Sequence, residues 1–112
     1  MAEKQTFTRA QYMAKECSHD DYYAQFVDQD LINFVKRQFG IAKLKKAYAI
    51  SHTFNDVHDN GIVLAKWDRV AYVVLNNQRI INALRNAGDV NARTLGNAVC
   101  ILKQAARMAI SE

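Results

Sequence analysis

Proline is missing from the 112 residues, and glycine occurs only four times. All-β sandwiches and barrels usually mark their many turns with these two residues, so their scarcity argues against such folds. No apolar run approaches the roughly 20 residues that span a bilayer. The opening MAEKQTFTRA also lacks the apolar core of a signal peptide. These absences predict a helical protein that is soluble and cytoplasmic.

Cysteine is scarce too, with Cys17 and Cys100 as the only two. They show no C-x-x-C spacing typical of zinc or redox sites, so we expect two free thiols, although one disulfide between them stays open. The sequence has no G-x-S-x-G elbow and no Gly-rich phosphate loop. His19 with Asp20 and Asp21 suits a helix N-terminus better than an acid-base group. We therefore expect no enzyme and no cofactor.

What the chain does have is apolar residues, which make up 50% of it, while 23% are charged. This balance is typical of a folded globular protein, and the length suits one hydrophobic core. We predict a single helical domain over residues 1–112, folded as an all-α compact bundle of about six helices.

Capping residues and apolar stripes predict where the helices lie. Thr8, Ser18 and Asp28 are predicted to cap the first three helices, which should run to about Cys17, to about Val27 and to Gly40. Gly40 is expected to end its helix in a left-handed turn. The remaining helices are expected over Ile41 to Ala49, Ala65 to about Val74 with a break at Asn76-Asn77, about 78–88, and a last helix capped by Asp89 or Asn91.

Residues 50–64 have the weakest helical pattern, and their DNG turn signal leaves a short hairpin and a surface loop both open. The stretch DVHDNG partly matches a calcium-binding loop, but Trp67 stands where the bidentate Glu is required. His52, Asp56 and His58 are weak candidates for a zinc site, because their spacing has little specificity. We expect a capped turn and no metal.

The last predicted helix is rich in small residues, among them Gly96, Ala98, Ala105, Ala106 and Ala109. Small side chains allow a second helix to approach closely. Two interpretations follow: this is the central helix of the fold, or it is the surface of a homo-oligomer.

Charge is distributed unevenly. Residues 1–30 hold six acidic and three basic residues, whereas residues 31–55 hold five basic residues and no acidic one. Such a basic face suits an acidic protein or a nucleic acid, unless the acidic first third of the same chain neutralises it. Tyrosines are frequent in binding hot spots. The candidate binding residues are Lys36, Arg37, Lys43, Lys45, Lys46, Tyr22, Tyr23 and Tyr48.

The segment Phe39-Gly40-Ile41 resembles the turn of a helix-turn-helix. In that motif the position of Lys36 normally holds a small residue and the position of Lys46 a buried aliphatic one, so the two lysines argue against it. A second resemblance lies in TRAQYMAKECSHDDYYAQFV, from Thr8 to Val27, which looks like the opening of small uncharacterised bacteriophage or prophage proteins. This resemblance implies a phage accessory protein in the host bacterial cytoplasm and carries no activity or site. We expect a protein partner, either a host factor or a second copy. Nucleic acid is the alternative, and a small metal-dependent enzyme a remote third.

Overall fold

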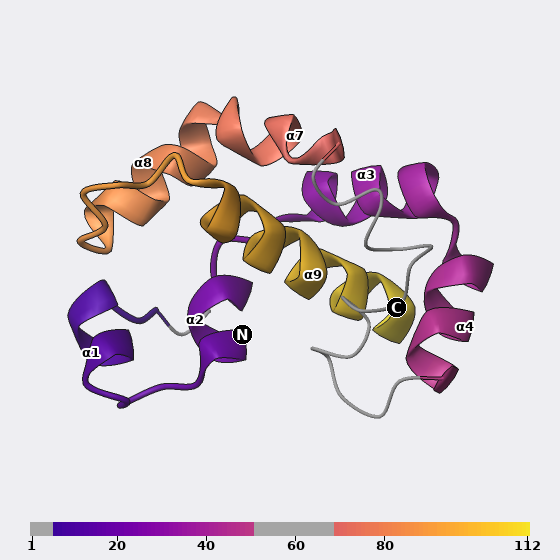
Figure 1. Cartoon of the computed structure of the whole chain (residues 1–112), viewed down its shortest axis with the longest axis horizontal. Coiled ribbons are helices and arrows are strands. Elements are labelled where there is room, and N and C mark those ends of the chain that lie inside the picture. Colours follow the sequence, from indigo (N-terminus) through magenta and orange to yellow (C-terminus); the bar gives the residue numbers. More distant parts are fainter. Residues whose placement is uncertain (1–5, 51–68) are drawn as a thin grey trace.

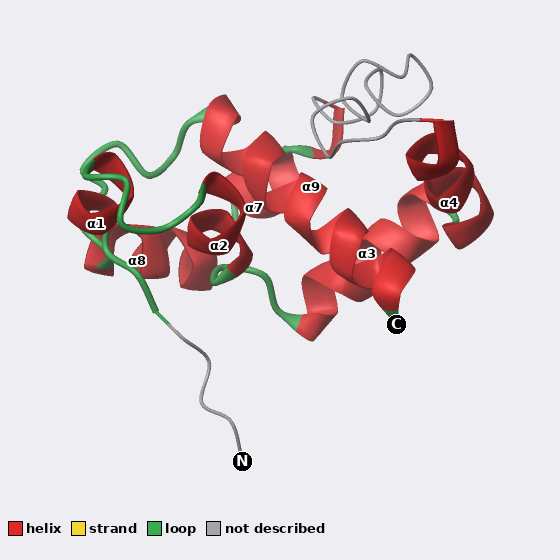
Figure 2. Cartoon of the chain, turned by 90° about the horizontal axis from the view of Figure 1, so that it is seen from below, coloured by secondary structure: helices red, strands yellow, loops and turns green. Residues whose placement is uncertain are grey.

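The computed structural model describes residues 6–50 and 69–112, and for residues 46–50 it describes the backbone alone. Within these ranges the chain forms seven helices and no strand, which confirms the all-α prediction (Figure 2). No helix in the described ranges combines the length and the apolar character needed to cross a membrane. The helices are α1 (Arg9–Met13), α2 (His19–Ala24), α3 (Gln29–Phe39), α4 (Ile41–Ile50), α7 (Tyr72–Leu75), α8 (Gln78–Asn86) and α9 (Leu95–Ser111).

The first three helices begin at the caps that the sequence predicts. The Thr8 hydroxyl accepts a hydrogen bond from the backbone N–H of Gln11, whose side chain accepts one from the Thr8 N–H in return. Ser18 and Asp28 cap α2 and α3 in the same way, each accepting from the N–H three residues later. These bonds satisfy N–H groups that have no partner within the helix.

Two of the predicted boundaries are wrong at the helix ends. α1 stops at Met13 instead of near Cys17, because Lys15 takes a φ of 62°, which a helix cannot continue through. α2 stops at Ala24, and residues 25–28 make the turn into α3. Both helices are short, so they depend on packing against the rest of the chain.

Gly40 alone separates α3 from α4. Its φ of 81° favours glycine, and its N–H bonds to the carbonyl of Lys36, so α3 ends there as predicted. Its ψ of 134° differs from the left-handed helical value that we expected. Because the joint is one residue long, the end of α3 and the start of α4 form a tight corner.

For α8 the sequence predicted a break at Asn76-Asn77 but named no cap, and for α9 it named the wrong cap. Asn77 caps α8 by accepting from the N–H of Ile80 at 3.1 Å, which confirms the break before it. Thr94 caps α9, where we had expected Asp89 or Asn91. Asp89 is buried, and one of its carboxylate oxygens accepts from the N–H of Asn91 at 2.9 Å, so both residues belong to the preceding loop.

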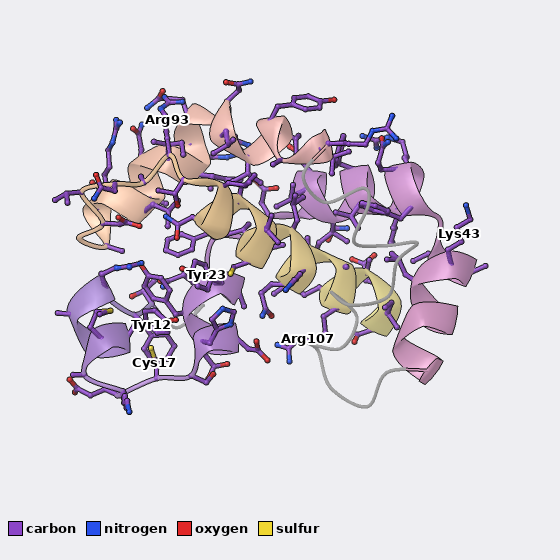
Figure 3. The ribbon with its side chains drawn as sticks, viewed as in Figure 1. Tyr12, Cys17, Tyr23, Lys43, Arg93 and Arg107 are labelled. Carbon is purple, nitrogen blue, oxygen red and sulfur yellow. The ribbon has the colours of Figure 1, made fainter. Side chains whose placement is uncertain are left out.

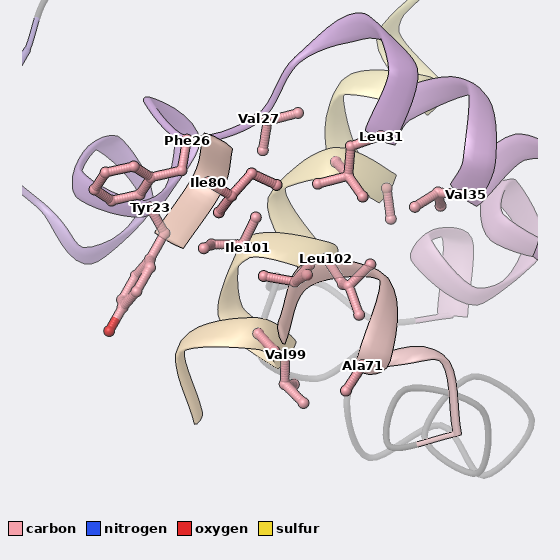
Figure 4. Packing of buried hydrophobic residues seen from close by; sticks show 14 of the residues in the cluster. Tyr23, Phe26, Val27, Leu31, Val35, Ala71, Ile80, Val99, Ile101 and Leu102 are labelled. Atoms are coloured by element: carbon pink, nitrogen blue, oxygen red, sulfur yellow. The ribbon is translucent and has the colours of Figure 1, made fainter. Parts of the chain in front are cut away.

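α9 is the central helix of the fold. It runs through the middle of the molecule, with α7 and α8 on one side, α1 and α2 on another, and α3 and α4 at one end (Figure 1). Its most extensive packing is against α3. Figure 4 shows Ile101 and Leu102 of α9 among Leu31 and Val35 of α3 and Ile80 of α8. The central-helix interpretation of the small residues is therefore confirmed.

Candidate functional site

The corner between α3 and α4 carries three exposed cations. Arg37 lies in the last turn of α3, and Lys43 and Lys45 lie in α4 just past Gly40. All three side chains are exposed. Figure 3 shows Lys43 projecting outward from the start of α4. We call these three residues the basic corner.

Lys36 and Lys46, the other two residues of the predicted basic face, do not extend the basic corner. The Lys36 ammonium forms an ion pair with the carboxylate of Glu112, which also accepts from Gln29 at 2.9 Å. The hydrogen bonds from Lys36 and then Gln29 lower the pKa of Glu112 from its ordinary value. Lys36 is thus engaged at the end of α9, and the side chain of Lys46 lies outside the described residues.

The acidic first third of the chain does not neutralise the basic corner. Its carboxylates pair elsewhere: Asp28 with Arg79, and Asp20 with Arg107 at 3.6 Å. Within residues 6–50 and 69–112, no ion pair involves any residue of the basic corner. All three side chains are exposed, and the described part of the chain provides no carboxylate partner for them.

A groove of about 370 Å³ lies beside the basic corner. It is lined by Gln38 near the end of α3, by Arg69 and Val70 just before α7, and by Tyr72, the first residue of α7. The Tyr72 side chain is 56% exposed, which is unusual for so large an aromatic residue. Tyr72 was not among the predicted binding residues, although its position off the apolar stripe of Val70, Ala71 and Val74 indicates an exposed ring. Those three stripe residues are buried, as predicted.

Tyr22 and Tyr23 were candidate binding residues on the condition that the core buries only one of the two rings, and the structure shows that it buries both. Tyr22 is fully buried and Tyr23 is 6% exposed. The Tyr12 ring stacks on Tyr22 with centroids 4.7 Å apart, so these aromatics hold α1 against α2. The core takes both because they project from adjacent positions of a short helix wedged between α1 and α9. The side chain of Tyr48 lies outside the described residues.

The Tyr23 hydroxyl belongs to a buried polar network. It donates to Oδ1 of Asn97, whose Nδ2 donates to Asp89 at 2.7 Å, and Arg9 lies 3.5 Å from the same carboxylate. Burial is the main cause that raises the pKa of Tyr23 to about 12. The network joins α1, α2, the loop before α9, and α9 itself, so its role is to hold these elements together.

The small residues of α9, one interpretation of which is a self-association surface, are mostly covered by other helices of the described chain. Ala98, Ala105, Ala106 and Ala109 are at most 2% exposed, because α3, α2, α7 and α4 pack around α9. Gly96 is exposed, but it lies in the first turn, away from the other small residues of the stripe. A second copy would have to dock on another surface.

The other predictions for sites stand as follows. His52, Asp56, His58 and most of the possible hairpin at 50–64 lie outside the described residues. In the part of the chain that is described, no three His, Cys, Asp or Glu side chains are arranged to hold a metal ion. Cys17 and Cys100 are both free thiols, so the disulfide alternative is not formed.

Comparison with protein-family models, with curated proteins and with solved structures finds no match in any of the three.

Proposed function

We propose that this chain works by binding, and that its basic corner receives a carboxylate-rich segment of another protein. The observation that carries the proposal is the set of three exposed cations, Arg37, Lys43 and Lys45, none of which has an ion pair among the described residues. Because no carboxylate among residues 6–50 and 69–112 pairs with them, we expect their field to extend into solvent and to favour the approach of an acidic partner. The resemblance of Thr8 to Val27 to phage proteins leads us to propose a partner in the host bacterium.

The groove beside the basic corner provides apolar contact surface, which the three cations do not. Exposed cations give long-range attraction, but close apolar contacts supply most of the affinity of an interface. Tyr72 offers apolar surface, and Gln38 and Arg69 offer hydrogen-bond donors. We propose that an acidic segment places its carboxylates on the basic corner and one side chain in this groove.

The test compares two charge-removing variants of the full chain. Arg37→Gln/Lys43→Gln/Lys45→Gln removes the basic corner, and Lys15→Gln/Arg85→Gln removes exposed charges from the α1–α2 turn and from α8. All five side chains are exposed, so both variants are expected to fold. Fluorescence anisotropy measures binding of a labelled glutamate-rich peptide. The corner variant should bind at least about tenfold more weakly, equivalent to about 1.4 kcal/mol, while the control changes little.

Nucleic acid is the second candidate, and Tyr72 is the observation that favours it. An exposed aromatic ring beside Arg69 is an arrangement on which an unpaired base can stack. A labelled mixed-sequence single-stranded oligonucleotide is titrated at several salt concentrations in the same assay. If the basic corner makes three phosphate contacts, its removal should reduce the slope of log K against log salt by about 2.

The outcomes separate the two candidates. Peptide binding that depends on the basic corner, with weak oligonucleotide binding, supports an acidic protein partner. The function is nucleic-acid binding instead if the oligonucleotide binds through the basic corner with a steep dependence on salt and if Tyr72→Ala abolishes that binding. Equal binding by the corner variant and the control overturns the basic corner as a binding surface for either.

A further inference from the structure

The half-buried thiol of Cys100 on α9 contacts an imidazole from α2. Its Sγ lies 3.3 Å from Nε2 of His19, although the two residues are 81 positions apart in the chain. The other ring nitrogen of His19, Nδ1, lies 3.4 Å from Oδ1 of Asp20. A proton on Nδ1 would point toward the carboxylate, which leaves the lone pair of Nε2 facing the thiol. This is the order of nucleophile, base and orienting carboxylate that activated thiols use.

The carboxylate of Asp20 is itself held by α9. Gln104 donates from Nε2 to Oδ1 of Asp20 at 2.7 Å, and Nη1 of Arg107 lies 3.6 Å from Oδ2. Figure 3 shows Arg107 on the side of α9 that faces α2. Gln104 is fully buried, and its Oε1 has no hydrogen-bond partner. Because Cys100, Gln104 and Arg107 lie within two turns of one helix, they share one face with the imidazole set against them.

The imidazole ring is also fixed by aromatic contacts. The ring of His19 lies 4.9 Å from that of Tyr23 and 6.2 Å from that of Tyr12, measured between centroids. These contacts leave 40% of the His19 side chain exposed. A small reagent can therefore approach from the imidazole side.

The surroundings of Cys100 make a base necessary. Burial is the largest cause that raises the pKa of its thiol, Asp20 raises it further, and Lys103 opposes both. A thiol with a raised pKa carries almost no thiolate at neutral pH, and the thiolate is the reactive form. Alone, Cys100 would be inert, so its reactivity depends on transfer of its proton to Nε2 of His19.

We propose that Cys100 and His19 form a thiol-modification site that makes a mixed disulfide with a small disulfide bearing carboxylate groups. Cys100 Sγ attacks one sulfur of the reagent while its proton passes to His19 Nε2. The new sulfur–sulfur bond forms as the reagent's own bond breaks, and the leaving thiolate takes the proton from His19 to depart as a thiol. The reagent is the oxidant, and the products are a mixed disulfide and one free thiol. The choice of disulfide follows from Arg107, whose 45% exposed guanidinium can pair with a carboxylate beside the thiol.

Cys17 provides an internal comparison within the same chain. Burial raises the pKa of its thiol, and the nearby carboxylates of Asp21 and Glu16 raise it further. Among the described residues, no histidine is hydrogen-bonded to Cys17, whereas His19 contacts Cys100. Its reaction with a disulfide should therefore show only the ordinary rise with thiolate fraction as the pH increases.

The experiment measures the rate of mixed-disulfide formation with oxidised glutathione from about pH 6 to about pH 9, by mass spectrometry of the intact chain. Cys17→Ser isolates Cys100. At about pH 7 it should react at least about tenfold faster than Cys17→Ser/His19→Gln, since general-base assistance is worth about that or more. Equal rates at every pH, or reaction only after denaturation, would overturn the proposal. Circular dichroism establishes that both variants are folded.

A second measurement does not depend on the histidine variant. The imidazole of His19 is titrated by NMR in the Cys17→Ser protein, before and after Cys100 is blocked as its mixed disulfide. A coupled pair should show a different midpoint in the two states, and an unchanged midpoint would contradict the pairing.

For the choice of reagent, oxidised glutathione is compared with cystamine, which is cationic. The carboxylate reagent should react faster, and Arg107→Gln should remove that preference; no preference in the starting protein removes carboxylates from the proposal.

Discussion

The hydroxyl of Tyr23 donates a 2.8 Å hydrogen bond to the amide oxygen of Asn97, which lies 74 positions later in the chain. Both residues are buried, and the Asn97 amide passes the connection on to Asp89. Burial of polar groups is tolerated where each finds a partner, and this bond supplies one for both side chains. It fixes α2 on the first turns of α9.

Removing this hydroxyl should destabilise the fold without altering its shape. Tyr23→Phe leaves the Asn97 oxygen buried without its donor, so we expect a loss of about 1 to 3 kcal/mol in the free energy of unfolding. Urea denaturation measures it. Tyr72→Phe is the matched control, because that ring is 56% exposed, and it should change stability by less than about 0.5 kcal/mol. Equal effects in the two variants would show that the network adds nothing.

Alkaline pH should weaken the fold through the same side chain. Burial raises the pKa of Tyr23 to about 12 in the folded state, above the ordinary 10.0 expected when unfolded. A raised folded pKa means that the stabilisation is complete below pH 10 and is lost as the pH climbs from about 10 toward about 12. Denaturation at several pH values should show this decline, and it should be shallower in Tyr23→Phe. A parallel decline in both proteins would assign the effect to other groups.

The centre of α9 should be the most sensitive part of the core. Leu102 is fully buried, so Leu102→Ala should cost about 2 to 5 kcal/mol through lost burial and the cavity left behind. Leu95→Ala removes the same atoms at the start of the helix, where the side chain is 49% exposed, and should cost less than about 1 kcal/mol. Thermal or urea unfolding compares the two, and similar losses would contradict the central place of α9.

The cap of α9 can be located by substitution. Thr94→Ala should cost about 1 kcal/mol, because the N–H of Asn97 loses the hydroxyl that accepts its hydrogen bond at 3.2 Å. Asn91→Ala removes a side chain that is exposed in the preceding loop and should cost less than about 0.5 kcal/mol. A larger loss of stability in Asn91→Ala than in Thr94→Ala would instead place the cap at Asn91, as the sequence suggested.

Features that depend on near neighbours were predictable from the sequence. Thr8, Ser18 and Asp28 cap their helices through bonds to the N–H three residues later, and such bonds require only local geometry. The cap at Thr94 was missed because Asp89 and Asn91 have the same capping chemistry. What separates them is the burial of Asp89 against Asn97, which is a tertiary contact.

Features that join distant positions could not be predicted. Nothing in the spacing of His19 and Cys100 indicates that their side chains meet, because the contact depends on how α2 packs on α9. The same holds for Lys36. In the sequence it is one cation of a basic run, and only the fold brings Glu112 beside it. Tyr72 lies between these cases. Its position off the apolar stripe is visible in the sequence and indicates an exposed ring, but Tyr72 was not predicted as a binding residue.

The central place of α9 also bears on how the protein is made. Synthesis delivers the earlier helices first, at roughly 5 to 20 residues per second, so several seconds pass before residues near 100 emerge. During that time the apolar faces of α2 and α3 have no core to join, and the nascent chain exposes them to other proteins. The core can therefore form only after α9 has been synthesised. A ribosome that stalls before α9 would leave an incomplete chain with exposed apolar surface, and such a chain would depend on chaperones.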